Sequence, residues 1–153
     1  FVEDDGAFCV DASDMVEEAM NRVTSTLSLL LGGIAGISLV VGGIGIMNIM
    51  LVSVTERTKE IGLRMSVGAR GVDIMSQFLI ESIMISLTGA ILGVFLGYGG
   101  SWIASTFFAL PSNVPFWSVG VSFCVCAFIG VFFGYVPARK AARMDPIEAL
   151  RYE

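Results

Sequence analysis

Two long stretches without charge constrain this chain more than any other feature. Residues 23–55 contain no Asp, Glu, Lys or Arg, and neither do residues 82–138. A helix of about 20 apolar residues crosses the hydrocarbon core of a bilayer, so both stretches can hold membrane spans. The second is too long for one span, and Pro111 and Pro115 interrupt it by removing backbone donors. The sequence therefore predicts three spans, roughly Leu27–Val54, Ile74–Phe108 and Phe116–Val136.

The composition agrees with a membrane protein and argues against several other classes. Hydrophobic residues make up 55% of the chain and charged residues 15%, which is too apolar for an ordinary soluble domain. The three cysteines, with no histidine beside them, have the spacing of neither a disulfide framework nor a zinc site. We find no nucleophile–base pair and no phosphate-binding loop. We therefore expect no catalytic, cofactor-binding or metal-binding residue, no enzymatic activity in this chain and no nucleic-acid partner.

The distribution of Lys and Arg predicts the orientation in the membrane. Four of the nine lie in residues 56–73 and four in residues 137–153, whereas residues 1–22 hold Arg22 alone among seven acids. Three spans place the two basic segments on the same side, which the positive-inside rule assigns to the cytoplasm. We expect residue 1 to lie outside and the C-terminus inside. An outward start at Phe1 also predicts that a longer N-terminal region precedes it.

The outer segment predicts the end of one domain and the start of a stalk. We expect residues 1–13 to close an extracytoplasmic domain, with residues 8–10 as its last strand. Asp14 followed by Glu17 has the pattern of a capping box that starts a helix. An apolar seam then runs into the first span, which predicts one helix over 14–54 that is a stalk first and a span second. A helix that simply abuts the span is the alternative. The seam consists of Val16, Met20, Val23, Leu27 and Leu30.

Small residues recur at every fourth position in all three spans. Such faces let helices approach closely in lipid, although glycine is also common in membrane helices generally. We interpret them as packing faces, either within the chain or against a second copy. The glycines of these faces are Gly32, Gly36, Gly89, Gly93, Gly97, Gly130 and Gly134.

Strongly polar side chains are rare inside the predicted spans. Asn48 lies in the first, and Glu81 lies about two turns into the second, near the inner interface. A proton relay needs several ionisable groups at mid-depth. We therefore favour a tethering role for Glu81, through a basic residue of the charged segment that follows the first span.

That charged segment, residues 55–70, has a helical pattern. Arg57, Ile61 and Met65 are spaced by four, and Glu60 with Arg64 form a favourable i,i+4 pair. Gly68 allows the helix to end. Mixed acids and bases suit a protein surface better than a lipid surface, although both remain open. The candidate docking residues are Glu56, Arg57, Lys59, Glu60, Ile61, Arg64 and Met65.

Three segments resemble a known family. "VGGIGIMNIMLVSVTERTKEIGLRMSVGAR", "FLIES" and "ARKAARMDPIEALRYE" are similar to the permease domain of MacB-type, or FtsX-like, ABC transporters. The resemblance covers about Met15 to Glu153, nearly the whole chain. It implies an all-α membrane protein: three transmembrane helices, an outward stalk helix, a cytoplasmic coupling helix and a short cytoplasmic C-terminal helix. The implied segments are stalk and span 14–54, coupling helix 55–70, span 72–108, outer turn 109–115, span 116–136 and cytoplasmic tail 137–153.

The resemblance also implies a function. FtsX-like permeases are non-catalytic dimers of the bacterial inner membrane that work with an ABC ATP-binding subunit or domain, which holds the ATP and magnesium. The implied role is mechanotransmission for export or extraction of a drug, peptide or lipoprotein-type substrate, with a periplasmic adaptor and membrane lipid as further partners. The alternative is transmembrane signalling to a cell-envelope partner. A secondary transporter is disfavoured, since the sequence has no inverted repeat.

Within this resemblance, we expect Ile61 and Met65 to enter a groove on the ATPase, with Arg57, Glu60 and Arg64 at the rim. Met65 departs from the family pattern, which often has lysine there. We expect the loss of this lysine to alter charge matching to the ATPase, while the Gly68-Ala69 turn is kept.

The topology is testable by cysteine labelling. A single cysteine introduced at Ser112, in the turn between the second and third spans, should react with a membrane-impermeant reagent in intact cells. Labelling that requires permeabilisation would reverse the predicted orientation.

Overall fold

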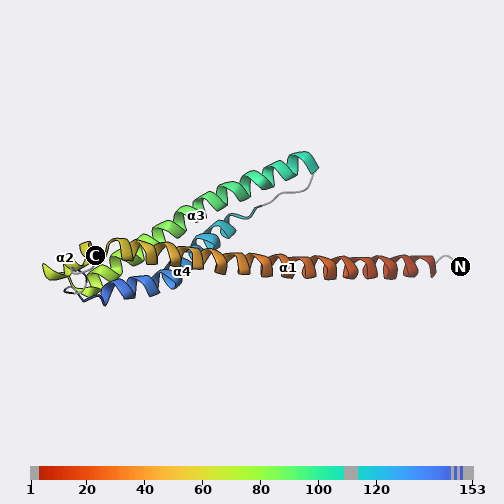
Figure 1. Cartoon of the computed structure of the whole chain (residues 1–153). Helices are drawn as coiled ribbons and strands as arrows, with labels where there is room; N and C mark the ends of the chain where they lie inside the picture. Colours follow the sequence, from red (N-terminus) through yellow and green to blue (C-terminus); the bar gives the residue numbers. More distant parts are fainter. Residues whose placement is uncertain (1–3, 109–113, 146, 148, 150–153) are drawn as a thin grey trace. The chain divides into compact units, whose positions relative to one another are not determined.

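Helices are the only regular elements in the described part of the chain, which comprises residues 4–108, 114–145, 147 and 149 of a computed structural model. The four helices are α1 (Asp4–Glu56), α2 (Thr58–Ser66), α3 (Gly71–Phe108) and α4 (Phe116–Ala142) (Figure 1). The chain divides into two compact units, Phe1–Val40 and Val41–Glu153. The second unit contains the end of α1 and all of α2, α3 and α4.

The three apolar helices predicted from the sequence are confirmed. Segments of α1, α3 and α4 are each long and apolar enough to cross a membrane: Ser13–Glu56, Gly71–Phe107 and Phe116–Ala142. The protein is therefore a multi-pass membrane protein. The predicted outer turn at 109–115 lies mostly outside the described residues, which resume at Val114.

The predicted start of the first helix is wrong. α1 begins at Asp4, so the backbone of residues 8–10 is helical and is not a strand, and Asp14 with Glu17 lies inside the helix. A strand needs a neighbouring strand to satisfy its backbone donors and acceptors, whereas a helix satisfies them within itself. The described part of the chain offers residues 8–10 no such neighbour. The seam residues lie on this helix and are exposed, and what covers them stays a prediction.

The third apolar helix also runs further than expected. α4 continues past Val136, the predicted end of the span, through Pro137 to Ala142. A proline inside a helix forfeits one backbone hydrogen bond. Here the extra turns bury Ala138 and Ala141 completely, which offsets part of that cost.

α3 and α4 pack most closely where serines face glycines. The Ser82 hydroxyl donates to the carbonyl of Gly130 at 2.9 Å, and the Ser86 hydroxyl donates to the carbonyl of Cys126 at 2.8 Å. A Cβ atom placed on Gly130 would lie 2.6 Å from Ser86 Oγ, and one on Gly134 would collide with the Ser82 side chain. The missing side chains therefore allow hydroxyl-to-carbonyl hydrogen bonds between the helices.

The hydrophobic core of the second unit lies next to this contact, where all four helices meet. Its fully buried members come from every helix: Met50 and Val54 of α1, Ile61 of α2, Ile74 and Phe78 of α3, and Ala138 and Ala141 of α4. Gly43 of α1 faces the ring of Phe133 of α4. α1 therefore also approaches α4 about two turns before its core residue Met50.

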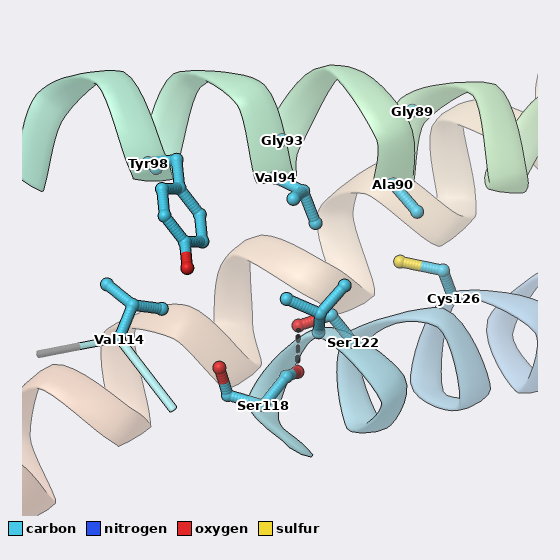
Figure 2. Close-up of a pocket in the computed structure, with 11 residues that line it drawn as sticks. Gly89, Ala90, Gly93, Val94, Tyr98, Val114, Ser118, Ser122 and Cys126 are labelled. Carbon is cyan, nitrogen blue, oxygen red and sulfur yellow. Dashed lines mark hydrogen bonds between the residues drawn. The ribbon is translucent and has the colours of Figure 1, made fainter. Parts of the chain in front are cut away.

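Toward the other end of α3 and α4 the small-residue faces do not close. Gly89, Gly93 and Gly97 have no atom of another segment within 4 Å of a built Cβ atom. They line a groove of about 370 Å³ together with Ser118 and Ser122. Figure 2 shows Tyr98, Val94 and Ala90 of α3 pointing toward the α4 side of this groove. The prediction that these glycines pack closely stays open, as it does for Gly32 and Gly36 in the first unit.

The contrast between the two sets of glycines generates a stability prediction. Gly134→Ala should lower the free energy of unfolding by about 1–3 kcal/mol, because the new methyl group overlaps the Ser82 side chain. Gly93→Ala, the same chemical change at an open position, is the matched control and should leave stability unchanged in isolated protomers. Thermal unfolding in one detergent compares the two variants, and equal effects would contradict the close α3–α4 contact.

Candidate coupling site

The charged segment, predicted as one helix over 55–70, is divided: residues 55 and 56 end α1, and a short helix, α2, follows over Thr58–Ser66 after a bend. Arg57 has φ −96° and ψ 15°, outside the α-helical geometry, and separates α1 from α2. The backbone hydrogen bonds nevertheless continue across it, from the Arg57 N–H to Ser53 and from the Ile61 N–H to Arg57. The Thr58 hydroxyl donates back to the carbonyls of Val54 and Thr55, a contact that commonly bends helices.

The prediction that Gly68 allows the helix to end is confirmed: α2 stops at Ser66, and Gly68 follows the C-cap residue Val67. This glycine has φ +108°, a left-handed conformation that other residues rarely adopt. The Gly68 N–H donates to Met65 O at 3.1 Å, and the Ala69 N–H donates to Arg64 O at 3.0 Å, the pattern of a Schellman motif. α3 then starts at Gly71, and the carboxylate of Asp73 in its first turn accepts a hydrogen bond from the Arg70 backbone N–H at 3.2 Å. The Gly68-Ala69 turn thus reverses the chain between α2 and α3.

The proposed apolar anchor of this helix does not face outward. Ile61 is 1% exposed and belongs to the core, and Met65 is partly buried against the same cluster. The interpretation that both enter a groove on a partner is therefore wrong for Ile61. An isoleucine spaced by four from Arg57 and Met65 fits a partner surface and the chain's own core equally well. In this structure Ile61 belongs to the core, in one buried cluster with Val54 and Phe78.

Polar contacts also fasten this helix to its neighbours. The Arg57 guanidinium lies 3.7 Å from the Glu81 carboxylate of α3, which is the contact expected of Glu81. Arg64 forms an ion pair with Glu60 and donates to the Gln77 side chain of α3 at 2.8 Å. Asn48, the other polar residue of the predicted spans, is exposed on α1 and belongs to no part of this site.

The outward face of α2 contains two apolar residues that the sequence analysis missed. Leu63 is 58% exposed and Val67 is 84% exposed, next to the exposed side chains of Lys59, Glu60 and Arg64. Lys59, Leu63 and Val67 are spaced by four, so they form a second stripe on the helix. Glu56 is exposed at the end of α1. We call Lys59, Leu63 and Val67, with Glu60 and Arg64, the outer face of α2.

The last described turn of the chain packs beside the site. The carboxylate of Asp145 accepts a hydrogen bond from the Ile147 N–H, and the Ala149 N–H donates to Asp145 O. Ala149 is buried. This helical turn agrees with the short C-terminal helix implied by the resemblance, most of which lies outside the described residues.

Comparison with known proteins identifies the family. The sequence profile of the FtsX-like permease C-terminal domain matches residues 32–146. This chain belongs to the FtsX-like permease family. The match includes all of α2, α3 and α4, together with the part of α1 that reaches the core.

Individual relatives are similar over nearly the whole chain. It is 57% identical over 138 residues to the macrolide export ATP-binding/permease protein MacB of Bdellovibrio bacteriovorus, covering 90% of this chain and 21% of that protein. It is 52% identical over 141 residues to the ABC transporter permease YknZ of Bacillus subtilis, covering 90% of this chain and 35% of that protein. MacB of Hahella chejuensis is 52% identical over 150 residues, 95% of this chain and 22% of that protein. The chain thus spans between a fifth and about a third of these relatives' length.

The Arg57–Glu81 contact can be tested by charge reversal. Glu81→Lys places two cations together and should lower the free energy of unfolding by about 1 kcal/mol, the scale of a partly exposed ion pair. Adding Arg57→Glu restores opposite charges and should recover most of the loss. Thermal unfolding of the single and double variants in one detergent provides the measurement. A double variant no more stable than Glu81→Lys would show that the two side chains act independently.

Proposed function

We propose that this chain is the membrane-embedded, non-catalytic part of an ABC exporter, and that α2 is the coupling helix on which the ATP-binding subunit or domain acts. The observation that carries this proposal is the two-sided construction of α2. Ile61 buries one side in the core, while the outer face presents Leu63 and Val67 beside charged residues. Exposed apolar residues ringed by charge are typical of docking sites between proteins.

The inner contacts of α2 support a mechanical role. A push on the outer face reaches α1 through Ile61 and the bend at Arg57, and reaches α3 through Gln77 and Glu81. A helix held by a core and by two polar contacts moves with its neighbours, because packed interiors transmit displacement instead of absorbing it. In this mechanism ATP binding and hydrolysis, with magnesium, occur on the partner. The motion passes along α1 toward the extracytoplasmic side.

Export is favoured over signalling by the names of the relatives. MacB of Bdellovibrio bacteriovorus and of Hahella chejuensis are both named for macrolide export. We therefore propose a drug, peptide or lipoprotein-type substrate that is handled on the extracytoplasmic side by a dimer in the bacterial inner membrane, with a periplasmic adaptor. With the C-terminus inside, as the distribution of Lys and Arg predicts, α2 and the C-terminal end of α4 face the cytoplasm.

The coupling proposal is tested by three variants of the full-length protein. Leu63→Asp should insert and fold normally, because Leu63 is exposed, but should lower permease-dependent ATP hydrolysis about tenfold or more. Lys59→Ala removes a charge from the rim and should have little effect. Ile61→Asp should instead reduce the amount of folded protein, because it buries an unpaired carboxylate in the core.

Photocrosslinking tests the contact directly. A photoreactive side chain at position 63 should form an adduct with the ATP-binding subunit or domain. The same side chain at Ile80, exposed on α3, is the control and should not. Normal ATP hydrolysis in Leu63→Asp, together with no adduct from position 63, would reject α2 as the coupling helix.

A further inference from the structure

A basic cavity lies where the start of α3 meets the end of α4. It has a volume of about 380 Å³. Arg139 and Arg143 of α4 supply its charged lining, and Val72 and Met75 of α3, with Tyr135 of α4, supply an apolar and aromatic wall. Among the described residues that line it, none is acidic. The docking proposal for the outer face of α2 makes no use of this cavity.

Both arginines are available for an anionic ligand. Their side chains are exposed, and no carboxylate in the described part of the chain forms a salt bridge with either one. Asp73, the nearest acid along α3, accepts a hydrogen bond from the Arg70 backbone and does not line the cavity. A pair of guanidinium groups with this freedom suits a phosphate group, which each can bind through two N–H donors.

An exposed aromatic stripe leads from the cavity along α4. Phe128, Phe132, Tyr135 and Arg139 are spaced by four, three and four, so they share one helix face. Phe128 is 68% exposed and Phe132 is 62% exposed, and their rings stack at a centroid distance of 6.1 Å. The stripe lies within a candidate membrane span. Its surface is therefore the one that acyl chains would contact.

We propose that this cavity binds the headgroup of an anionic phospholipid. The lipid phosphate lies between Arg139 and Arg143, and an acyl chain follows Tyr135, Phe132 and Phe128. Charge complementarity supplies the headgroup contact, and continuity with the aromatic stripe selects a lipid over a soluble anion. Basic pockets between membrane helices commonly bind anionic headgroups in this way. The proposal is independent of ATPase coupling, because it uses neither α2 nor its outer face.

The adjoining cavity provides an internal control. It is formed by Thr55, Thr58, Lys140 and Arg143, but Asp145 also lines it. The negative charge of the Asp145 carboxylate repels a phosphate group, so we expect no anionic lipid in this second cavity. Of these two cavities, Lys140 lines the second and not the first, whereas Arg139 lines the first and not the second. Lys140→Gln and Arg139→Gln therefore remove the same charge from adjacent positions of α4 with different expected results.

The test uses the full-length protein, delipidated in detergent and supplied with phosphatidylglycerol or phosphatidylcholine. Native mass spectrometry should show that the wild type retains phosphatidylglycerol in preference to phosphatidylcholine, and that excess inorganic phosphate does not displace it. Arg139→Gln should weaken phosphatidylglycerol retention about fivefold. Phe132→Ala, which leaves the charge intact, should weaken it too, whereas Lys140→Gln should leave it at the wild-type level.

Three outcomes of the retention and binding measurements would overturn the proposal. Equal losses in Arg139→Gln and Lys140→Gln would indicate general attraction to a basic surface. Displacement by inorganic phosphate would indicate a soluble anion. Unchanged lipid retention with weaker binding of the ATP-binding subunit would assign the arginines to a protein interface. A test with photoactivatable phosphatidylglycerol uses the wild type and so does not depend on whether a variant folds. The lipid should label peptides containing Tyr135, and failure to label them would reject the site.

Discussion

The close contact between α3 and α4 is the interaction on which the rest of the second unit depends. Lipid provides little hydrophobic force between helices, so association relies on tight packing and hydrogen bonds. Gly130 and Gly134 let α3 come near enough for Ser82 and Ser86 to reach backbone carbonyls of α4. With the two helices joined in this way, the residues that follow on α4 and precede on α3 meet around one core.

That core determines what α2 can do. Ile61 fills it from α2, beside Phe78 of α3 and Val54 of α1, so the short helix is attached by its apolar side to three others. The polar contacts from Arg57 and Arg64 to α3 limit its remaining freedom. A helix attached so firmly by one side has only the opposite side for a partner. The outer face with Leu63 and Val67 follows from the burial of Ile61.

The two halves of α3 and α4 use small residues differently. On the core side, serines fill the space that the glycines leave, and the helices touch. On the other side, Gly89, Gly93 and Gly97 border an open groove, with Tyr98 and Val94 among its lining (Figure 2). The same four-residue spacing thus accompanies both a closed and an open interface. What distinguishes them is whether the opposing helix is close enough to present a side chain to each glycine.

The sequence by itself determined the local features of this protein. Charge-free stretches establish three apolar helices, because hydrocarbon excludes charge and a spanning backbone must be helical. The motifs around ERTKEIG establish the family, and Gly68 marks the end of α2 because it allows a left-handed conformation. Glu81 could be paired with the charged segment because it is the one acid inside the predicted span Ile74–Phe108 and lies near its inner end.

Only the tertiary structure decided which side of each helix is covered. Ile61 and Leu63 are both apolar residues of one short helix, and nothing local distinguishes the core residue from the exposed one. The four-residue spacing also includes Ser82, Ser86 and Ala90. Their burial, and the hydrogen bond from Ser82 to α4, are seen only in the folded structure. The periodicity of a sequence states which residues share a face. The assignment of that face to the core, to a groove or to a partner depends on residues far away in the chain, whose positions are decided by packing.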